Sequence, residues 1–395
     1  MRYVVIGGAG AMGRLIVRDL VEFCPAKDEI CVADYDEHRA RELARQLRKS
    51  VQVLPVDVQH PQTVVKALKG AFVAINSVQY QWNLKVMESA LAAKTHYIDL
   101  GGLFHATREQ LRLHERFSKI GKTALIGMGA APGITNILSR FGADQFETVK
   151  EIHTRVASVD RTQCHEPPAL SVSYSLQTIL EEISQPPAVF TRGKFKFVEP
   201  MSGGKAHVFP HPVGKQTPIH TLHSEVATLP ISFARKGVEE VSFKIAFEKD
   251  FLDRVRFLRD LGFASHDPVQ LRGLRVIPIE FINRIAMSQA PLRRKGPLRQ
   301  CEVIRAIVKG MRKGRRETLV VDCLNRGMPE WNVGTDTGTG SPPAIAAQML
   351  ANNEIVQRGV VPAEVAVPYG PFFRQLRKRR MRVRVSKKTE WNFPV

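Results

Sequence analysis

Glycines near the start of the chain have the spacing that a phosphate-binding turn requires: Gly8, Gly10 and Gly13. They follow the apolar run Tyr3 to Ile6, and helical periodicity begins directly after them. Such glycines permit a tight turn, leave room for a pyrophosphate and let the helix pack closely on the strand. Ala11 and Met12 lie where the helix N-terminus offers N–H groups to the phosphates. The pattern predicts a dinucleotide-binding turn.

Residues that end the next predicted strands complete this binding site. Asp34 closes a second strand and is placed to accept hydrogen bonds from ribose hydroxyls, whereas it would repel a 2′-phosphate. NAD is therefore favoured, and the nearby Arg39 keeps NADP open. Asp57 and Val58 close a third strand, where an adenine ring would bind. Asn76 follows a fourth strand, where the nicotinamide half would lie.

Three side chains are candidates for acid–base chemistry. Asp99 closes the strand 96–100 and would accept a proton near the cofactor; the alternative is a structural acid that caps the turn at 101–102. Tyr80 would donate a hydrogen bond to the nicotinamide half. His223 has a side chain whose pKa can lie near neutral pH, although a structural role is an alternative.

Candidate substrate-binding residues lie further along the chain. Glu225 and Thr228, close to His223, would face the substrate, and Arg235 could hold a carboxylate through its planar fork. Thr339 belongs to a Gly/Thr segment, residues 334–341, that we predict to be a turn before a helix at 342–350. The neighbours Cys164, His165 and Glu166 do not point at one ion, so we expect no metal site.

The elements that must position these residues predict an α/β fold. Apolar runs at 3–6, 30–34, 51–58, 71–75, 96–100 and 124–126 alternate with helical patterns, which is typical of a doubly wound parallel sheet. Beyond about residue 150 the rhythm changes. Strands of a more antiparallel kind are expected at 152–159, 189–198, 239–247 and 303–308, and helices at 176–183, 251–261 and from 278.

Composition limits the class of protein. A chain of 395 residues predicts two domains, and no apolar run approaches the roughly 18 residues of a membrane span. Five scattered cysteines and the lack of a secretory signal lead us to expect a cytoplasmic protein with reduced thiols. The net charge is +20, yet Met381 to Val385 alternates like a strand with its arginines outward, so we expect no specific nucleic-acid binding.

Several longer stretches resemble the saccharopine dehydrogenase family, and most closely its L-lysine 6-dehydrogenase-like branch. They occur in the family's order along nearly the whole chain: Gly8–Gly13 with Asp34, Tyr80–Asn83, Tyr97–Gly102, Ala131–Asn136, Glu225–Leu229 and Thr337–Ala344. The stretch His220–Glu225 is nearer to the saccharopine and carboxynorspermidine enzymes of the family than to the lysine dehydrogenases.

The resemblance implies a fold and an activity. It implies a Rossmann domain over residues 1–130, completed by about 335–395, and an inserted α+β domain over 131–334 for substrate binding and dimerisation. The implied activity is NAD(P)-dependent oxidation or reductive formation of a C–N bond in a basic amino acid, by a homodimer. A carboxynorspermidine-type or opine-type dehydrogenase is one alternative. Another is a non-catalytic dinucleotide sensor with a basic docking face.

Overall fold

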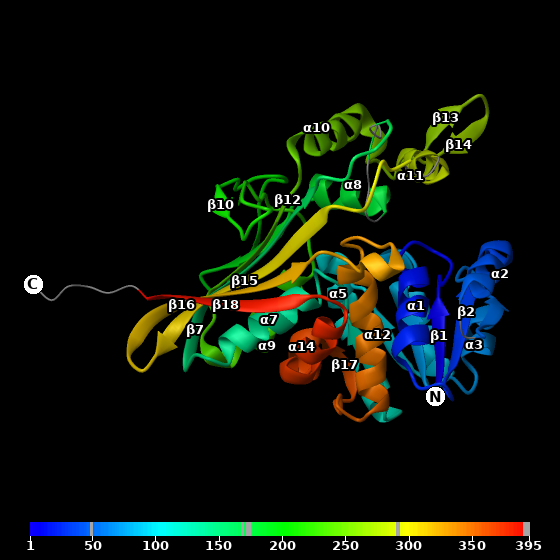
Figure 1. The fold of residues 1–395 in the computed structure, drawn as a ribbon, viewed down its shortest axis with the longest axis horizontal. Helices are drawn as coiled ribbons and strands as arrows, with labels where there is room; N and C mark the ends of the chain where they lie inside the picture. Colours follow the sequence, from blue (N-terminus) through cyan, green and yellow to red (C-terminus); the bar gives the residue numbers. More distant parts are fainter. Residues whose placement is uncertain (48–49, 167–169, 171–174, 290–292, 390–395) are drawn as a thin grey trace, which may run out of the picture.

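Two seven-stranded sheets organise the molecule (Figure 1). The computed structural model describes residues 1–47, 50–166, 170, 175–289 and 293–389. The first sheet comes from the N-terminal third of the chain and one later strand, and the second from the remainder. Within the described residues, no helix is long and apolar enough to cross a membrane.

The first sheet is parallel throughout, as the alternating strand and helix patterns predict. Its order is β17 (Gly359–Pro362), β6 (Thr123–Ile126), β5 (His96–Asp99), β4 (Val73–Asn76), β1 (Arg2–Ile6), β2 (Glu29–Asp34) and β3 (Gln52–Pro55). Alternate residues of β1 enter different cores: Tyr3 and Val5 pack on one face, Val4 and Ile6 on the other. Burial on both faces explains why this strand is apolar throughout.

Helices cover both faces of the first sheet. One face packs against α1 (Gly13–Phe23), α2 (Glu37–Gln46) and α12 (Thr337–Ala351), and the other against α3 (Pro61–Leu68), α4 (Asn83–Ala92) and α6 (His114–Lys119). Further helices are α5 (Phe104–Leu111), α13 (Ala363–Ala366) and α14 (Tyr369–Lys378). The doubly wound α/β prediction is confirmed.

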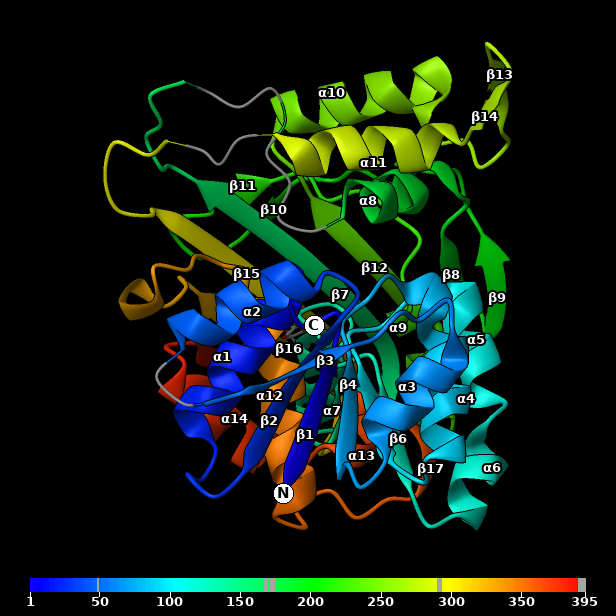
Figure 2. The same ribbon diagram turned by 90° about the vertical axis from the view of Figure 1, so that its right-hand side faces the viewer.

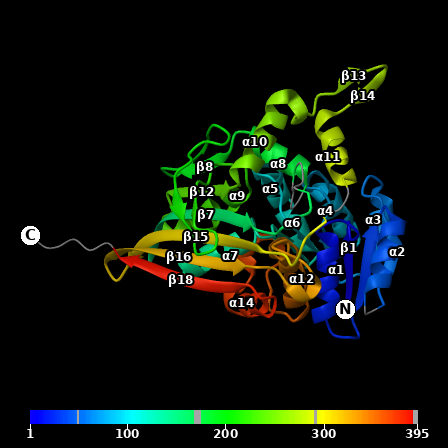
Figure 3. The same cartoon turned by 45° about the horizontal axis from the view of Figure 1, so that its top comes forward.

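The second sheet is mixed. Its order is β18 (Arg382–Thr389), β16 (Arg315–Asn325), β15 (Gln300–Arg312), β7 (Thr148–Asp160), β12 (Glu240–Ala246), β8 (Ala188–Thr191) and β9 (Lys194–Phe197). Figure 3 shows β7, β15, β16 and β18 side by side. The pairing is antiparallel except between β7 and β12, which run in the same direction. β18 is the strand that the alternation at Met381 to Val385 predicts, and Arg382 and Arg384 are exposed on it.

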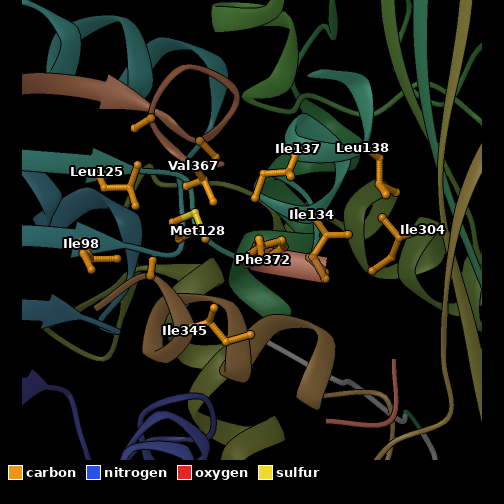
Figure 4. Close-up of a cluster of buried hydrophobic side chains, with 14 of the residues drawn as sticks. Ile98, Leu125, Met128, Ile134, Ile137, Leu138, Ile304, Ile345, Val367 and Phe372 are labelled. Atoms are coloured by element: carbon orange, nitrogen blue, oxygen red, sulfur yellow. The ribbon is translucent and has the colours of Figure 1, made fainter. Parts of the chain in front are cut away.

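A shared apolar core joins the two sheets. The helix α7 (Ile134–Ala143) packs against β15, and its apolar side chains belong to the same buried cluster as Ile98 of β5 and Leu125 of β6 (Figure 4). Ile304, Ala306 and Val308 of β15 face this core, so the alternating residues of β15 point to the opposite, outer face of the second sheet. The two faces of this sheet therefore have different environments.

Two predictions of local structure need correction. Only residues 334–336 of the Gly/Thr segment precede the helix as a turn, because α12 already begins at Thr337. Its glycines let the helix approach its neighbours: a Cβ on Gly340 would overlap Leu15 of α1, and one on Gly338 would overlap Glu302. The predicted strand 189–198 is a hairpin, turned by Arg192 and Gly193 with positive φ angles. The end of the chain completes both sheets, because β17 joins the first and β18 the second.

The segment 249–288, here called the arm, projects beyond the second sheet (Figures 1 and 2). It contains α10 (Lys249–Leu258), a π-helical turn (Arg259–Phe263), β13 (Val269–Leu271), β14 (Leu274–Val276) and α11 (Pro278–Ser288). The helix α8 (Leu176–Ser184) packs against α11 at its base. The remaining elements are α9 (Glu225–Ser232) and the short pair β10 (His207–Val208) and β11 (Lys215–Gln216).

Candidate functional site

The glycine-rich turn between β1 and α1 has the form of a phosphate cradle. Gly7 adopts a φ of +73° and donates to the carbonyl of Ala33, so the residue that turns the chain is Gly7 rather than Gly8. A Cβ on Gly13 would overlap the carbonyl of Gly7, so this glycine allows the close helix–strand packing that the sequence predicts. A Cβ on Gly10 would approach that same carbonyl, and the remaining space beside Gly10 is open.

The N-terminus of α1 can hold the cofactor's phosphates. Within the described chain, the backbone N–H groups of Ala11 and Met12 donate to no acceptor. Together with the open side of Gly10, they form the donor set that a pyrophosphate needs. Asp34 lies beside this turn, where its two oxygens accept from the N–H groups of Ala9 and Asp36 at 2.9 and 3.0 Å. These residues fit a dinucleotide, and each carboxylate oxygen keeps a lone pair for a ribose hydroxyl.

The other predicted cofactor residues have different surroundings. Asp57 and Val58 are half-buried after β3, and the Asp57 carboxylate accepts from the N–H of Gln59 at 2.8 Å. Asn76 is 1 % exposed and points into the protein, where its amide donates to Asn83 at 2.9 Å and to Tyr97 at 3.2 Å. The Oδ1 of Asn76 is buried and accepts no hydrogen bond from any described residue, and a contact of Asn76 with the nicotinamide half stays a prediction.

Asp99 is a buried carboxylate with a full set of donors. Its oxygens accept from the N–H groups of Gly101 and Gly127 at 2.9 and 2.8 Å, from Tyr97 at 3.0 Å and from Gln110 at 2.5 Å. Burial raises its pKa, although these hydrogen bonds act in the opposite direction. The geometry matches the structural alternative, because the carboxylate ties the end of β5 to the turns at Gly101 and Gly127.

His223 lies between the buried acids Glu182 and Glu225, and Glu181 is the neighbour of Glu182 on α8; we call these four residues the Glu–His cluster. His223 Nδ1 lies 2.6 Å from Glu225, its Nε2 lies 3.6 Å from Glu182, and its ring stacks on Phe243. Burial alone lowers the pKa of His223, but the carboxylates of Glu225 and Glu182 outweigh it and the net shift is upward. This imidazole is held ready to carry a proton.

A hydrogen-bond network anchors the Glu–His cluster to α7. Thr135 donates to Glu225 at 2.9 Å. The neighbouring Asn136 donates to Thr228 at 3.3 Å and to Glu364 at 2.8 Å. The structure thus brings together three of the predicted residues, His223, Glu225 and Thr228, and adds Glu364, which the sequence does not single out.

The helix α8 brings acids against the end of the first sheet. Glu181 Oε1 accepts from Gln177 at 3.2 Å and lies 2.9 Å from His266 Nε2, whereas its Oε2 is buried and accepts no hydrogen bond from any described residue. Tyr80 is half-buried near it, and burial together with the charge of Glu181 raises the pKa of the Tyr80 hydroxyl. Gln79 donates to Gln177 at 3.1 Å, so the loop that follows β4 contacts α8 here.

Two predicted substrate residues lie apart from the Glu–His cluster. Arg235 is exposed in the 3₁₀ turn Ala234–Lys236, beyond the end of α9. Thr339 is half-buried in the first turn of α12, with its methyl group beside Gly129. Within the described residues, no group of three or more His, Cys, Asp or Glu side chains could hold a metal ion.

Glu181 and Glu182 are the functional candidates that sequence reasoning missed. They occur side by side within a predicted helix, where adjacent glutamates usually mark a solvated face. In the structure both are almost completely buried, at 2 % and 4 % exposure. Only the five apolar or uncharged residues that precede them on the same helix give a hint, and they do not reveal which face of the helix is covered.

Comparison with known proteins agrees with this geometry. Residues 3–125 match the family model of the saccharopine dehydrogenase NADP binding domain, and residues 129–381 match that of the saccharopine dehydrogenase C-terminal domain. Carboxyaminopropylagmatine dehydrogenase from Synechocystis sp. is 23% identical over 95% of both chains. Carboxynorspermidine synthase from Vibrio alginolyticus is 20% identical over 70% of this chain and 71% of its own.

A solved structure shares the whole fold. Saccharopine dehydrogenase (L-Glu forming) from Saccharomyces cerevisiae superposes with a TM-score of 0.74 at 16% identity, covering 98% of this chain and 100% of that one. Both family models lie on the described sheets, the first on the parallel sheet that carries the glycine-rich turn. The chain belongs to the saccharopine dehydrogenase family of NAD(P)-dependent oxidoreductases.

Proposed function

We propose that this enzyme forms or oxidises the secondary amine of a carboxylated polyamine. Its relatives from Synechocystis sp. and Vibrio alginolyticus are named for carboxylated amines, which supports this choice over the lysine or saccharopine substrate of the sequence prediction. The carboxynorspermidine-type alternative is therefore our first candidate. The substrate would carry ammonium groups, and the chemistry of the Glu–His cluster suits such a cation.

One observation carries the proposal: the buried Oε2 of Glu181 accepts a hydrogen bond from no described residue within 3.5 Å, while the carboxylate acts on the nearby Tyr80 hydroxyl. A buried carboxylate oxygen without a donor is costly, and a substrate ammonium would supply that donor. Glu182 lies on the same helix, so a second carboxylate is close to the first. In a chain of net charge +20, such a concentration of buried acid on α8, beside the loop that follows β4, favours a cationic substrate.

The residues around the substrate would handle its proton. When NAD(P)H is bound, it supplies a hydride to the carbon of an imine. Glu225 holds Nδ1 of His223, so the Nε2 proton is available to the nitrogen of the reduced product. In the oxidation direction the same nitrogen atom of His223 would take that proton back. Because its pKa is raised, the Tyr80 hydroxyl stays protonated and can donate to the substrate or cofactor.

Absorbance of NAD(P)H tests this proposal directly. Carboxynorspermidine, carboxyaminopropylagmatine, saccharopine and lysine are offered with NAD or NADP, and the reverse direction is assayed from amine and aldehyde. We expect kcat/KM for a carboxylated polyamine to exceed that for saccharopine or lysine at least tenfold. Glu181→Gln should raise KM for the amine, whereas Glu115→Gln, an exposed acid on α6, should leave it unchanged.

Two outcomes would contradict the proposal. Faster turnover of saccharopine or lysine would restore the amino-acid substrate that the sequence resemblance implies. Tight cofactor binding without turnover in either direction, on any of these compounds, would favour the dinucleotide sensor. We retain NAD as the preferred cofactor, since the buried carboxylate of Asp34 would repel a 2′-phosphate, and fluorescence titration of NADH against NADPH checks this preference.

We also propose a homodimer in which residues 131–334 provide both the substrate domain and the dimer contacts. The arm supports this proposal, because it exposes large apolar side chains: Phe257, Leu261, Leu271, Leu274 and Met287. Light scattering should show a dimer that Leu271→Asp and Leu274→Asp weaken, and a monomeric wild type would refute it.

A cytoplasmic location remains our proposal, supported by five cysteines that form no disulfide.

A further inference from the structure

A cavity of about 410 Å³ lies on the outer face of the second sheet, away from the Glu–His cluster. Its walls include the basic side chains Arg155, Arg305, Lys309, His153 and His207. His207 comes from β10, whereas the other four alternate along β7 and β15 with residues that face the shared core, such as Ile152 and Ile304. The cavity therefore opens on the side of the sheet opposite α7, and the family's activity gives it no role.

Strand register places cations directly opposite one another across this face. Lys244 of β12 lies opposite Arg155 of β7, and Arg155 lies opposite Arg305 of β15. The row continues with Asp322 of β16 and Arg384 of β18. Like charges directly opposite each other destabilise a sheet, and this row contains four cations and one carboxylate. The arrangement therefore contributes no stability to the sheet itself.

The single carboxylate of the row is already occupied. Asp322 binds Arg305 through two hydrogen bonds, from Nε at 2.6 Å and from a terminal nitrogen at 2.9 Å. The remaining terminal nitrogen of Arg305 donates to the carbonyl of Val208 at 2.9 Å. Lys309, at the rim, pairs with Glu151 at 2.8 Å. The positive charge that stays uncompensated is centred on Arg155.

Arg155 is buried without an acid. It is 6 % exposed, and within the described residues no carboxylate lies within 4.0 Å of its guanidinium. One terminal nitrogen donates to the carbonyls of Thr154 and Ser242, at 2.7 and 3.3 Å, but the Nε–H is buried and finds no acceptor. Burial lowers the pKa of Arg155 to about 10, and burial together with Arg155 lowers that of Lys244 to about 8. Both cations therefore lack a counter-charge.

We propose that this cavity binds a small oxyanion, a phosphate or a carboxylate, on the guanidinium of Arg155. An arginine fork matches two oxygens of such a group, and the free Nε–H is one of the donors that it would use. Bound there, the anion would neutralise the row that Lys244, Arg155 and Arg305 form. This binding site is independent of the proposed amine chemistry, which takes place across the sheet.

Calorimetric titration of the full chain with inorganic phosphate, pyrophosphate and citrate, at constant ionic strength, tests the site. We expect Arg155→Met, which keeps the long apolar stem, to weaken anion binding at least tenfold. Lys309→Met, at an exposed rim position, should weaken it several-fold without disturbing the fold. Arg45→Met, exposed on α2 of the first sheet, is the matched control; its binding should match wild type.

The same titrations show which anion fits and what would overturn the proposal. Tighter binding of phosphate or pyrophosphate than of citrate would identify a phosphate site, and the reverse a carboxylate site. Equal affinity in wild type and Arg155→Met, or no binding of any of the three anions to wild type, would refute the proposal. So would a wild-type dimer that is insensitive to anions but becomes monomeric in Arg155→Met, because a partner's carboxylate would then occupy the cavity.

Discussion

The two faces of the second sheet carry buried charges of opposite sign. On the inner face, the ring of Phe243 stacks under His223, which is held between Glu182 and Glu225. On the outer face, the next residue of the same strand, Lys244, begins the row of cations that includes Arg155. One strand therefore separates a site suited to a cation from a site suited to an anion.

The contrast shows which unpaired polar group each face offers to its proposed ligand. The inner acids are supported by donors from α7 and neighbouring elements, and one oxygen, Oε2 of Glu181, is left without a donor. The row of outer cations contains one carboxylate, Asp322, and within the described residues one donor of this row, the Nε–H of Arg155, is left without an acceptor. Each face thus keeps one unsatisfied group of the sign that its proposed ligand would satisfy.

The largest expected effect lies on the inner face. His223→Asn removes the group that exchanges a proton with the substrate nitrogen, so we expect kcat to fall about a thousandfold. The cofactor should still bind, since His223 is remote in the chain from the glycine-rich turn. Steady-state kinetics and NADH fluorescence provide the two measurements, with His105→Asn, exposed on α5, as the control. An unchanged kcat would remove His223 from the mechanism.

Substitution of Asp99 tests whether a carboxylate with a full set of hydrogen-bond donors affects stability rather than kcat, in contrast to the Glu–His cluster. Asp99→Asn replaces an acceptor by an N–H₂ group that faces other donors, so the free energy of unfolding should fall by about 3 kcal/mol. We expect kcat to change little in the folded fraction. Denaturant titration and kinetics measure both, beside the exposed control Asp267→Asn. A large loss of kcat at unchanged stability would instead support the catalytic role predicted from the sequence.

Glu302, at the core-facing side of β15, offers a third kind of buried charge. Burial raises its pKa to about 7, so the protonated form stabilises the fold. That contribution is complete below about pH 4.5 and is lost as pH rises through 7. At pH 8, Glu302→Gln should therefore be more stable than wild type by about 2 kcal/mol, and the difference should vanish at low pH. Thermal unfolding of both proteins across this pH range tests the assignment. A stability difference that does not change with pH would contradict it.

The smallest effect concerns the charge beside His223. Glu182 raises the pKa of His223, so Glu182→Gln should lower that pKa and move the corresponding limb of the pH–rate profile to lower pH, by roughly one unit. The profile of Glu115→Gln should match wild type. A limb that stays in place, with turnover retained, would show that a different group titrates.

Local patterns in the sequence determine the first sheet. The apolar run of β1, the glycine-rich turn and the helix after it are contiguous in the chain. Each strand that follows is again a short apolar run. Gly8 to Gly13 and Asp34 therefore lead to the dinucleotide site without knowledge of any distant contact. The one local error there, Gly7 rather than Gly8 as the turning residue, shifts the turn by a single position.

Segments whose structure depends on distant neighbours were predicted less well. The Gly/Thr stretch before Pro342 looks like a turn, yet it is helical because its glycines fit against Leu15 and Glu302, which lie far away in the chain. In the same way, Asp99 is predicted at the right place, the end of β5, but its donors Gln110 and Gly127 come from later elements and decide its role.

The sequence by itself determined the family, the parallel sheet and the nicotinamide dinucleotide, because these depend on short-range spacing of glycine, apolar and acidic residues. The tertiary structure alone decided which charges are buried together. Glu181 faces the first sheet only because α8 packs where it does, and Arg155 meets Lys244 and Arg305 only through the register of strands far apart in the chain. Burial and pairing set the energy of a charge, and neither is a property of local sequence.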